Sequence, residues 1–353
     1  MRSVHVVVPE GIDDPARPSG GNTYDRRLCH GLRRLGWTVH EHPVAGGWAR
    51  RDPTALAALA GVVQQIPDRA VVLLDGLLAS TAPAVLVPHA GRVHLVVLVH
   101  MPLGHRPADD PAEYIRMREQ AVLSAATAVV TTSVWSRRRL LGLYQLPPDR
   151  VHVAEPGVDA ADLATGTEAG GALLCVAAVI PEKGHDVLLD ALHTVSDLSW
   201  QCVCVGRLDR DRAFVERMRG HNAGMEDRVQ FAGPRTGPEL ERSYAGADLM
   251  VLGSRAETYG MVITEALAHG LPVVVAEVGG VTEALGYGAD QIRPGSLVPP
   301  DDPRALGVAL RAWLTDAELR RRLRQAARAR RESLPRWSTT ATILAGVLAG
   351  VAG

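Results

Sequence analysis

The sequence has 353 residues, 46% hydrophobic and 22% charged, as expected of a globular protein with one large or two medium domains. Its formal net charge of −1 gives no reason to expect a nucleic acid as a partner. No apolar run reaches the roughly 18 residues of a membrane span, and the apolar start is too short for a signal peptide, so we expect a cytoplasmic protein.

Short apolar segments alternate with segments of helical periodicity along most of the chain. We expect strands at 4–8, 38–42, 70–74, 93–99, 128–131, 151–153, 172–179, 200–206, 229–231, 249–252 and 272–276. Helices are expected at 22–35, 111–126, 133–143, 185–195, 238–245, 260–269, 303–314 and 317–332. Several strands are apolar at nearly every position, as parallel strands covered on both faces are. The alternation predicts an α/β protein with parallel sheets.

A polar, Gly-rich stretch at 154–171 divides this alternation into two halves. Each half holds enough strands for a doubly wound sheet, so we expect two Rossmann-like domains, 1–160 and 161–335, facing a cleft. The segment 336–353 follows Pro335, which breaks the preceding helix, and we expect a C-terminal helix that packs back on the N-terminal domain. Ligands of such sheets bind beyond the carboxyl ends of the strands, in the loops that follow them.

The four cysteines, Cys29, Cys175, Cys202 and Cys204, form no Cys-x-x-Cys pair. Cys202 and Cys204 are two residues apart in an apolar run, so both would point to one face of a strand. We interpret them as buried thiols rather than as a metal site or a disulfide.

The most informative segment follows strand 249–252 and contains Glu257 and Glu265 in the run SRAETYGMVITEALAHGLPVV. Glu257 lies in a loop, and Glu265 lies roughly 8 Å along the next helix. The N–H groups exposed where that helix starts, near Gly260, suit a phosphate. The two acids would then suit a sugar at one end of a diphosphate and a ribose at the other. If only the spacing of Glu257 and Glu265 is considered, the alternative is that both are solvent-exposed acids near an ordinary helix start.

Further motifs accompany this segment: PGVD at 156–159, PEKGHDVLLDAL at 181–192, FAG at 231–233, YAGAD at 244–248 and VGGVTEAL at 278–285. Together they resemble the retaining glycosyltransferases of family 4, which have the GT-B fold. The resemblance implies a metal-independent, front-face transfer from a UDP- or GDP-linked sugar. It also implies that the N-terminal domain binds the acceptor and the C-terminal domain binds the donor.

The resemblance assigns roles to residues of the second half. Glu257 would contact hydroxyls of the donor sugar, and Glu265 would hold the ribose. Lys183, the only lysine of the chain, matches the family lysine that neutralises the diphosphate; a surface lysine in a turn is the alternative. The backbone would contact the phosphate or sugar at Thr258, Tyr259 and Gly260, and the base at Gly233 and Pro234.

The sequence departs from the family pattern at Ala178, where the family has an arginine that also contacts the diphosphate. Arg207, at the end of strand 200–206, is a candidate substitute, and a solvated loop arginine is the equal alternative. Asp209 and Asp211 form a D-x-D triplet, which binds metal in another glycosyltransferase fold. We interpret one of them as the cap of a helix that begins near 212.

The N-terminal half offers weaker candidates. Gly20 and Gly21 stand before Asn22 and a helix, where glycines let the backbone approach a ligand closely, although a plain turn is an alternative. His100, at a strand end, resembles a family histidine beside the donor sugar, although such histidines are commonly just hydrogen-bonded. Asp75, at another strand end, is a candidate for acceptor contact together with Asn22.

Arg26, Arg27, Arg33 and Arg34 occupy one arc of the helix at 22–35. They would suit peripheral contact with anionic lipids at the inner membrane face, or a solvated helix surface. The acceptor is open between a small molecule, a glycan and a lipid, and neither the nucleobase nor the sugar is specified. Two other classes of protein remain: a nucleotide-sugar epimerase or hydrolase on the same fold, and a non-catalytic nucleotide-sugar binding protein.

Overall fold

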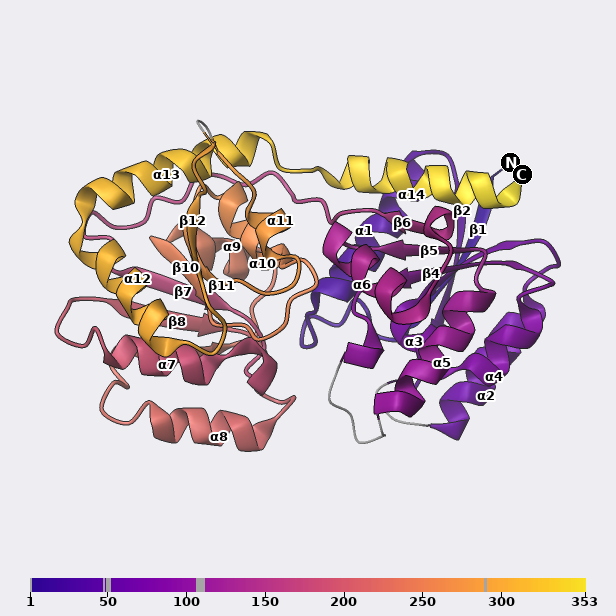
Figure 1. The fold of residues 1–353 in the computed structure, drawn as a ribbon, viewed down its shortest axis with the longest axis horizontal. Helices are drawn as coiled ribbons and strands as arrows, with labels where there is room; N and C mark the ends of the chain where they lie inside the picture. The colour runs from indigo at the N-terminus through magenta and orange to yellow at the C-terminus, as the bar shows by residue number, and fades with distance from the viewer. Residues whose placement is uncertain (1, 47, 49–51, 106–111, 289–290) are drawn as a thin grey trace. The chain divides into compact units, whose positions relative to one another are not determined.

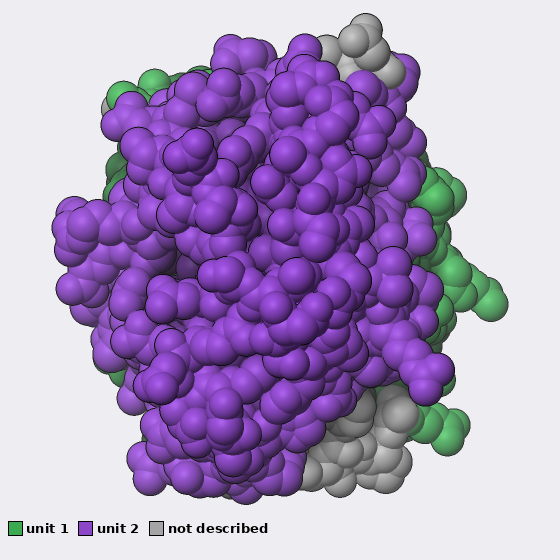
Figure 2. All heavy atoms as spheres, turned by 90° about the vertical axis from the view of Figure 1, so that its left-hand side faces the viewer, with its two compact units in different colours: residues 1–13, 19–157, 335–353 green, residues 14–18, 158–334 purple. Residues whose placement is uncertain are grey.

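The computed structural model describes residues 2–46, 48, 52–105, 112–288 and 291–353 (Figure 1). The chain forms two compact units, coloured separately in Figure 2. The first comprises Met1–Asp13, Ser19–Gly157 and Pro335–Gly353, and the second comprises Asp14–Pro18 and Val158–Leu334. Each unit contains a six-stranded sheet, and all strand pairings that the structure describes are parallel. The α/β architecture expected from the sequence is therefore confirmed.

The sheet of the first unit has the strand order β2-β1-β3-β4-β5-β6. Its strands are β1 (Ser3–Pro9), β2 (Thr38–Val44), β3 (Val71–Asp75), β4 (His94–Val99), β5 (Ala128–Thr131) and β6 (Val151–Val153). Its helices include α1 (Gly20–Arg34), α2 (Pro53–Gln65), α3 (Gly76–Thr81), α4 (Pro83–Leu86), α5 (Ala112–Ala125), α6 (Val134–Tyr144) and α14 (Trp337–Ala352). Every residue of β3 and β5 is buried, as their mostly apolar sequences predict.

The sheet of the second unit has the order β12-β11-β10-β7-β8-β9. Its strands are β7 (Ala172–Val176), β8 (Gln201–Val205), β9 (Val229–Gly233), β10 (Leu249–Leu252), β11 (Val273–Ala276) and β12 (Gly295–Val298). Its helices include α7 (His185–His193), α8 (Arg212–His221), α9 (Pro238–Ala245), α10 (Met261–Ala268), α11 (Val281–Leu285), α12 (Pro303–Thr315) and α13 (Ala317–Glu332). The neighbouring inner strands β10 and β11 are buried at every position.

The C-terminal helix α14 returns to the first unit and packs on α1, which confirms the expectation (Figure 1). The two helices approach so closely at Gly31 that a Cβ atom there would lie 2.4 Å from the Cβ of Ala341. The Trp337 ring lies edge-on to Tyr24 of α1, with centroids 5.6 Å apart. The Thr340 hydroxyl donates to the carbonyl of Glu155 at 2.7 Å, so this helix end is fixed to the chain where the first unit ends.

Several elements differ from the sequence-based expectation. Helix α1 begins at Gly20 rather than at residue 22, because the Ser19 hydroxyl accepts the N–H of Asn22 at 3.1 Å and caps the helix. Strand β7 ends at Val176, three residues before the expected end at 179. The edge strand β12 was missed, because it begins with glycine and is only partly buried. Helix α2 was also missed, although Asp52 and Pro53 form an ordinary helix start.

Two arginines of the arc on α1 are paired with acids. Arg26 donates to Asp13 and Glu41, and Arg33 also contacts Glu41 at 2.6 Å. The positive charge of this arc is therefore partly neutralised, and contact with anionic lipids stays a prediction. Among the described residues, no helix is long and apolar enough to cross a membrane.

Candidate active site

Lys183 and Glu257, which lie 74 residues apart in the sequence, form an ion pair in the second unit. Lys183 ends a short turn of 3-10 helix, Pro181–Lys183, between β7 and α7. Its Nζ donates to Oε1 of Glu257 at 2.6 Å, and the Ser254 hydroxyl donates to the same oxygen at 2.9 Å. The Lys183 side chain is 23% exposed and that of Glu257 is 11% exposed. The only lysine side chain of the sequence therefore lies at the loop that precedes α10.

Arg255 fastens the loop of Glu257 to the loop of Lys183. Its guanidinium donates two hydrogen bonds to the Asp186 carboxylate, at 2.9 and 2.8 Å, and its backbone N–H donates to the carbonyl of Glu182 at 2.8 Å. Burial by itself raises the pKa of Asp186, but the hydrogen bonds and charge of Arg255 outweigh it and hold that pKa below its usual value. The sequence analysis missed this pair, although both residues lie inside the quoted motifs.

Glycines allow the two loops to pack at backbone distance. Gly184 has φ +62°, and a Cβ atom there would lie 1.9 Å from the carbonyl oxygen of Gly253. Gly279 has φ +55°, and its Cβ would lie 1.7 Å from the carbonyl oxygen of Glu257. Neither position accepts a larger residue without moving the loops, because positive φ and close backbone contact coincide there. A third loop, 278–280, therefore packs against the backbone of Glu257.

Helix α10 begins directly after the loop that contains Glu257. Gly260, at φ +97°, occupies the N-cap position, and no side chain caps the helix. The first N–H groups of such a helix are suited to an anion. Thr258 is half-buried, whereas the Tyr259 side chain is buried in the core of the unit.

Glu265 lies on α10 and is held by a tyrosine. The Tyr244 hydroxyl donates to Oε2 of Glu265 at 2.8 Å, and the Tyr244 ring stacks on His269 with centroids 5.0 Å apart. Burial raises the pKa of Glu265; the Tyr244 hydrogen bond opposes this, and the charges of Glu241 and Asp159 add to it. Tyr244 is thus a further site residue that the sequence analysis did not single out, although it lies in the quoted YAGAD motif.

Arg207 lies beside the position where the family arginine is missing. The N–H of Val179, next to Ala178, donates to the carbonyl of Arg207 at 2.9 Å. The guanidinium, however, forms two hydrogen bonds of 2.9 Å to Asp209. The same contacts lower the pKa of Asp209, with the Arg207 hydrogen bonds as the largest cause. A ligand diphosphate would therefore compete with a carboxylate for Arg207.

The neighbouring D-x-D triplet and the FAG motif have structural roles. Asp211 caps α8, accepting the N–H of Phe214 at 2.8 Å, which confirms the capping interpretation. Gly233 ends β9 at φ +75°, and its carbonyl accepts the N–H of Gly206 at 2.9 Å. Pro234 follows directly, so the backbone at these two residues is fixed by the end of the sheet.

A second group of candidates lies in the first unit, at the ends of the neighbouring strands β3 and β4. Asp75 ends β3 and His100 follows β4, and the structure brings both to Asp25 of α1, which the sequence analysis missed. Nε2 of His100 is 2.8 Å from Oδ1 of Asp25 and 3.6 Å from Oδ2 of Asp75. Gly20, Gly21 and Asn22 form the first turn of α1, and Gly21 lies against the His100 ring.

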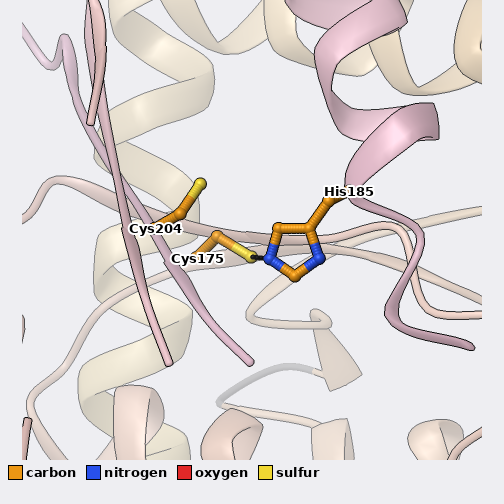
Figure 3. Close-up of side chains that lie close together, drawn as sticks. All are labelled: Cys175, His185 and Cys204. Carbon is orange, nitrogen blue, oxygen red and sulfur yellow. Dashed lines mark hydrogen bonds between the residues drawn. The ribbon is translucent and has the colours of Figure 1, made fainter. Parts of the chain in front are cut away.

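Cys175, His185 and Cys204 form a buried cluster at the start of α7 (Figure 3). Nε2 of His185 lies 3.7 Å from the Cys175 sulfur, and the three possible ligand atoms lie within 4.8 Å of one another. The hydrogen bond to Cys204 and burial raise the pKa of Cys175 well above its usual value, so this thiol keeps its proton. The four cysteines are free and buried, as predicted, and Cys175 contacts His185, the first residue of α7.

Comparisons with known proteins match both halves of the chain to glycosyltransferases. A model described as "Glycosyltransferase Family 4" matches residues 4–162, and one described as "Glycosyl transferases group 1" matches residues 168–330. The chain belongs to glycosyltransferase family 4. Two relatives are D-inositol 3-phosphate glycosyltransferases: the one of Jonesia denitrificans is 32% identical over 68% of this chain, and that of Thermobispora bispora is 33% identical over 68%. This family 4 chain spans 61% and 60% of their lengths.

Solved structures show the GT-B fold expected from the sequence. Sucrose-phosphate synthase from Thermosynechococcus elongatus superposes with a TM-score of 0.81 at 22% identity, over 99% of each chain. HepE of Anabaena, in complex with UDP-glucose, superposes with a TM-score of 0.79 at 18% identity, over 99% of this chain and 100% of its own. At these identities the likeness of the family 4 chain to both proteins concerns the fold.

Proposed function

We propose that this family 4 chain transfers a sugar from a nucleoside-diphosphate sugar to a hydroxyl group of an acceptor, with retention of configuration and without a metal ion. The observation that supports this most directly is the ion pair of Lys183 and Glu257 beside the uncapped start of α10. A diphosphate needs a cation and hydrogen-bond donors, and the donor sugar needs acceptors for its hydroxyls. Both kinds of group lie together at the start of α10, because Lys183 pairs with Glu257 there.

Each of these groups has a role in donor binding. The diphosphate is bound by the Lys183 ammonium and by the backbone N–H groups at Thr258, Tyr259 and Gly260. Glu257 accepts hydroxyls of the sugar. Glu265, whose Oε2 already accepts from Tyr244, binds the ribose hydroxyls. The backbone at Gly233 and Pro234 meets the base, and Arg207 supplies a second cation if it leaves Asp209.

The reaction follows from this arrangement. The bond between the anomeric carbon and the phosphate oxygen breaks, and the acceptor oxygen bonds to the same face of that carbon. The acceptor proton passes to the leaving phosphate oxygen, so the products are a glycoside and a nucleoside diphosphate. Negative charge develops on the leaving diphosphate, and a fixed cation such as Lys183 stabilises that charge in the transition state. The second unit binds the donor, and the first unit, with Asp75 and Asn22, binds the acceptor.

The relatives suggest which substrates to test first. HepE is described in complex with UDP-glucose, and two relatives about one third identical to this chain are described as D-inositol 3-phosphate glycosyltransferases. UDP-glucose and D-inositol 3-phosphate are therefore the first donor and acceptor, within a panel of UDP- and GDP-sugars with inositol phosphates, oligosaccharides and lipid acceptors.

The test measures release of nucleoside diphosphate by the full chain for each donor, alone and with each acceptor. We expect release that depends on an acceptor and persists in EDTA. Lys183→Ala and Glu257→Ala should each reduce it by orders of magnitude, whereas Arg322→Ala, at an exposed position of α13, should not. Equal release without acceptor would indicate a hydrolase, and conversion of the donor sugar without release would indicate an epimerase. Inhibition by EDTA that Mn²⁺ reverses would contradict the metal-free reaction.

A further inference from the structure

One segment of α1 encloses the His100 imidazole on three sides. Nε2 of His100 lies 2.8 Å from Oδ1 of Asp25. The Tyr24 ring lies edge-on to the imidazole, with centroids 5.2 Å apart. A Cβ atom at Gly21 would lie 3.3 Å from Cδ2 of His100, so the helix backbone approaches the ring closely. The ring therefore has one fixed orientation, with Nε2 toward the helix.

The carboxylates around this imidazole are buried and short of donors. Asp25 is 3% exposed, and its second oxygen, Oδ2, is buried with no hydrogen-bond partner in the described part of the chain. Asp75 is 8% exposed and uses Oδ1 to accept the N–H groups of Leu77 and Leu78 at the start of α3. Its Oδ2 lies 3.6 Å from Nε2 of His100. A buried carboxylate is costly unless a cation pairs with it, and His100 is the basic group in contact with both.

We propose that Asp25 is a positioning residue, which keeps the His100 imidazole doubly protonated, with Nε2–H on the buried carboxylate and Nδ1–H available to a ligand. A neutral imidazole accepts at one nitrogen and donates at the other, whereas the charged ring donates at both. His100 would thus present a cationic donor that recognises oxygen atoms of the substrate bound by the first unit. This ligand assignment rests on the proposed function, but the protonation state of the free protein does not.

The electrostatic balance supports the charged form. Burial lowers the pKa of His100, but the charge and hydrogen bond of Asp25 and the charge of Asp75 outweigh it and raise that pKa to about 9. Burial and the charge of Asp25 raise the pKa of Asp75 to about 7, against the effects of His100 and the two N–H groups. Among the described residues, Tyr24 is a further titratable group in contact with the ring, and burial raises its pKa well above its usual value, so it stays neutral. His100 is therefore charged throughout the physiological pH range.

Nitrogen-15 NMR of the full chain labelled at histidine measures this protonation directly, with His100→Gln assigning the signal. We expect His100 to titrate near pH 9 in the wild-type protein. In Asp25→Asn the midpoint of the His100 titration should fall by at least roughly two pH units, because a neutral amide stabilises the imidazolium less than a carboxylate does. Asp75→Asn, which keeps an oxygen for the cap, should lower it less, because Asp75 is farther from Nε2. A wild-type titration near pH 6.5 would overturn the proposal without any variant, even if Asp25→Asn does not fold.

The pH dependence of turnover is the second measurement. Wild-type kcat/KM should not fall between pH 6.5 and 8.5 on account of His100. Asp25→Asn should retain activity near pH 6 and lose about tenfold per pH unit above its lowered His100 pKa, a dependence that a purely structural residue would not create. Loss of the same factor at every pH would contradict a positioning role. NMR as expected with no turnover on any donor refutes the proposed function alone, whereas turnover with His100 titrating near 6.5 refutes this inference alone.

Discussion

Replacement of Lys183 by alanine tests whether its ammonium group stabilises the leaving diphosphate. The substitution removes the partner of Glu257, which keeps only the Ser254 hydroxyl at Oε1. Breaking the pair leaves a mostly buried carboxylate without a cation, at a cost of about 1–3 kcal/mol for a site between exposed and fully buried. The variant therefore changes both stability and transition-state energy, and the two effects have to be measured apart.

The expected catalytic effect is large. About one unit of negative charge develops on the diphosphate as the glycosidic bond breaks. At an effective dielectric constant of about 20, an ammonium about 4 Å from that charge stabilises it by about 4 kcal/mol. That energy corresponds to a decrease of roughly 1,000-fold in kcat. Loss of a single preorganised donor in other enzymes costs about 100- to 1,000-fold, so the two estimates agree.

A double variant separates the two effects. Lys183→Ala with Glu257→Gln removes both charges, so most of the stability lost in Lys183→Ala should return in urea denaturation. Donor turnover, measured as release of nucleoside diphosphate, should stay reduced at least about 100-fold in both proteins. Lys183→Ala that retains wild-type kcat while folded would refute the assignment, as would recovery of activity in the double variant.

Three further predictions concern packing and protonation. Asp248→Ala removes a buried carboxylate that binds Thr167 and Arg324, and should lower the free energy of unfolding by about 3–5 kcal/mol in urea denaturation; no change would contradict the pairing. Gly279→Ala should displace Glu257 and abolish turnover, whereas Gly61→Ala, with nothing within 4 Å of its Cβ, should leave activity unchanged. His100 has a raised pKa of about 9, so its stabilising contribution, about 3 kcal/mol, is complete below pH 6.5 and lost as pH rises through 9. The difference in free energy of unfolding between the wild-type protein and His100→Gln should show this loss, and a difference that does not change with pH would contradict it.

The fold could be predicted from the sequence because the buried strands consist mostly of apolar residues. The run Val129-Val130, like the segment 95–99, is apolar at each position, and such runs occur where helices cover both faces of a sheet. Strand β12 escaped prediction because an edge strand that is only partly buried has no such run. Helix α3, six residues long, is too short to display helical periodicity, and in the structure the Asp75 carboxylate caps its start.

The sequence indicated candidate site residues where one local motif contains both the residues and their spacing. Glu257, Gly260 and Glu265 lie within one loop and the helix that follows it, so their order along the site follows from helix geometry. Arg255 was passed over because an arginine in a loop has no visible partner in sequence, and its partner Asp186 lies 69 residues away.

Composition and periodicity by themselves determined two parallel α/β units and the positions of most strands, and one local motif indicated Glu257 and Glu265 as candidate donor contacts. Tertiary structure alone decided which distant side chains meet: Lys183 with Glu257, and Asp25 with His100. The physical reason is that hydrophobic periodicity records which face of an element is buried. Pairing across 74 or 75 residues depends instead on strand order, register and helix docking, and these exist only in the folded chain.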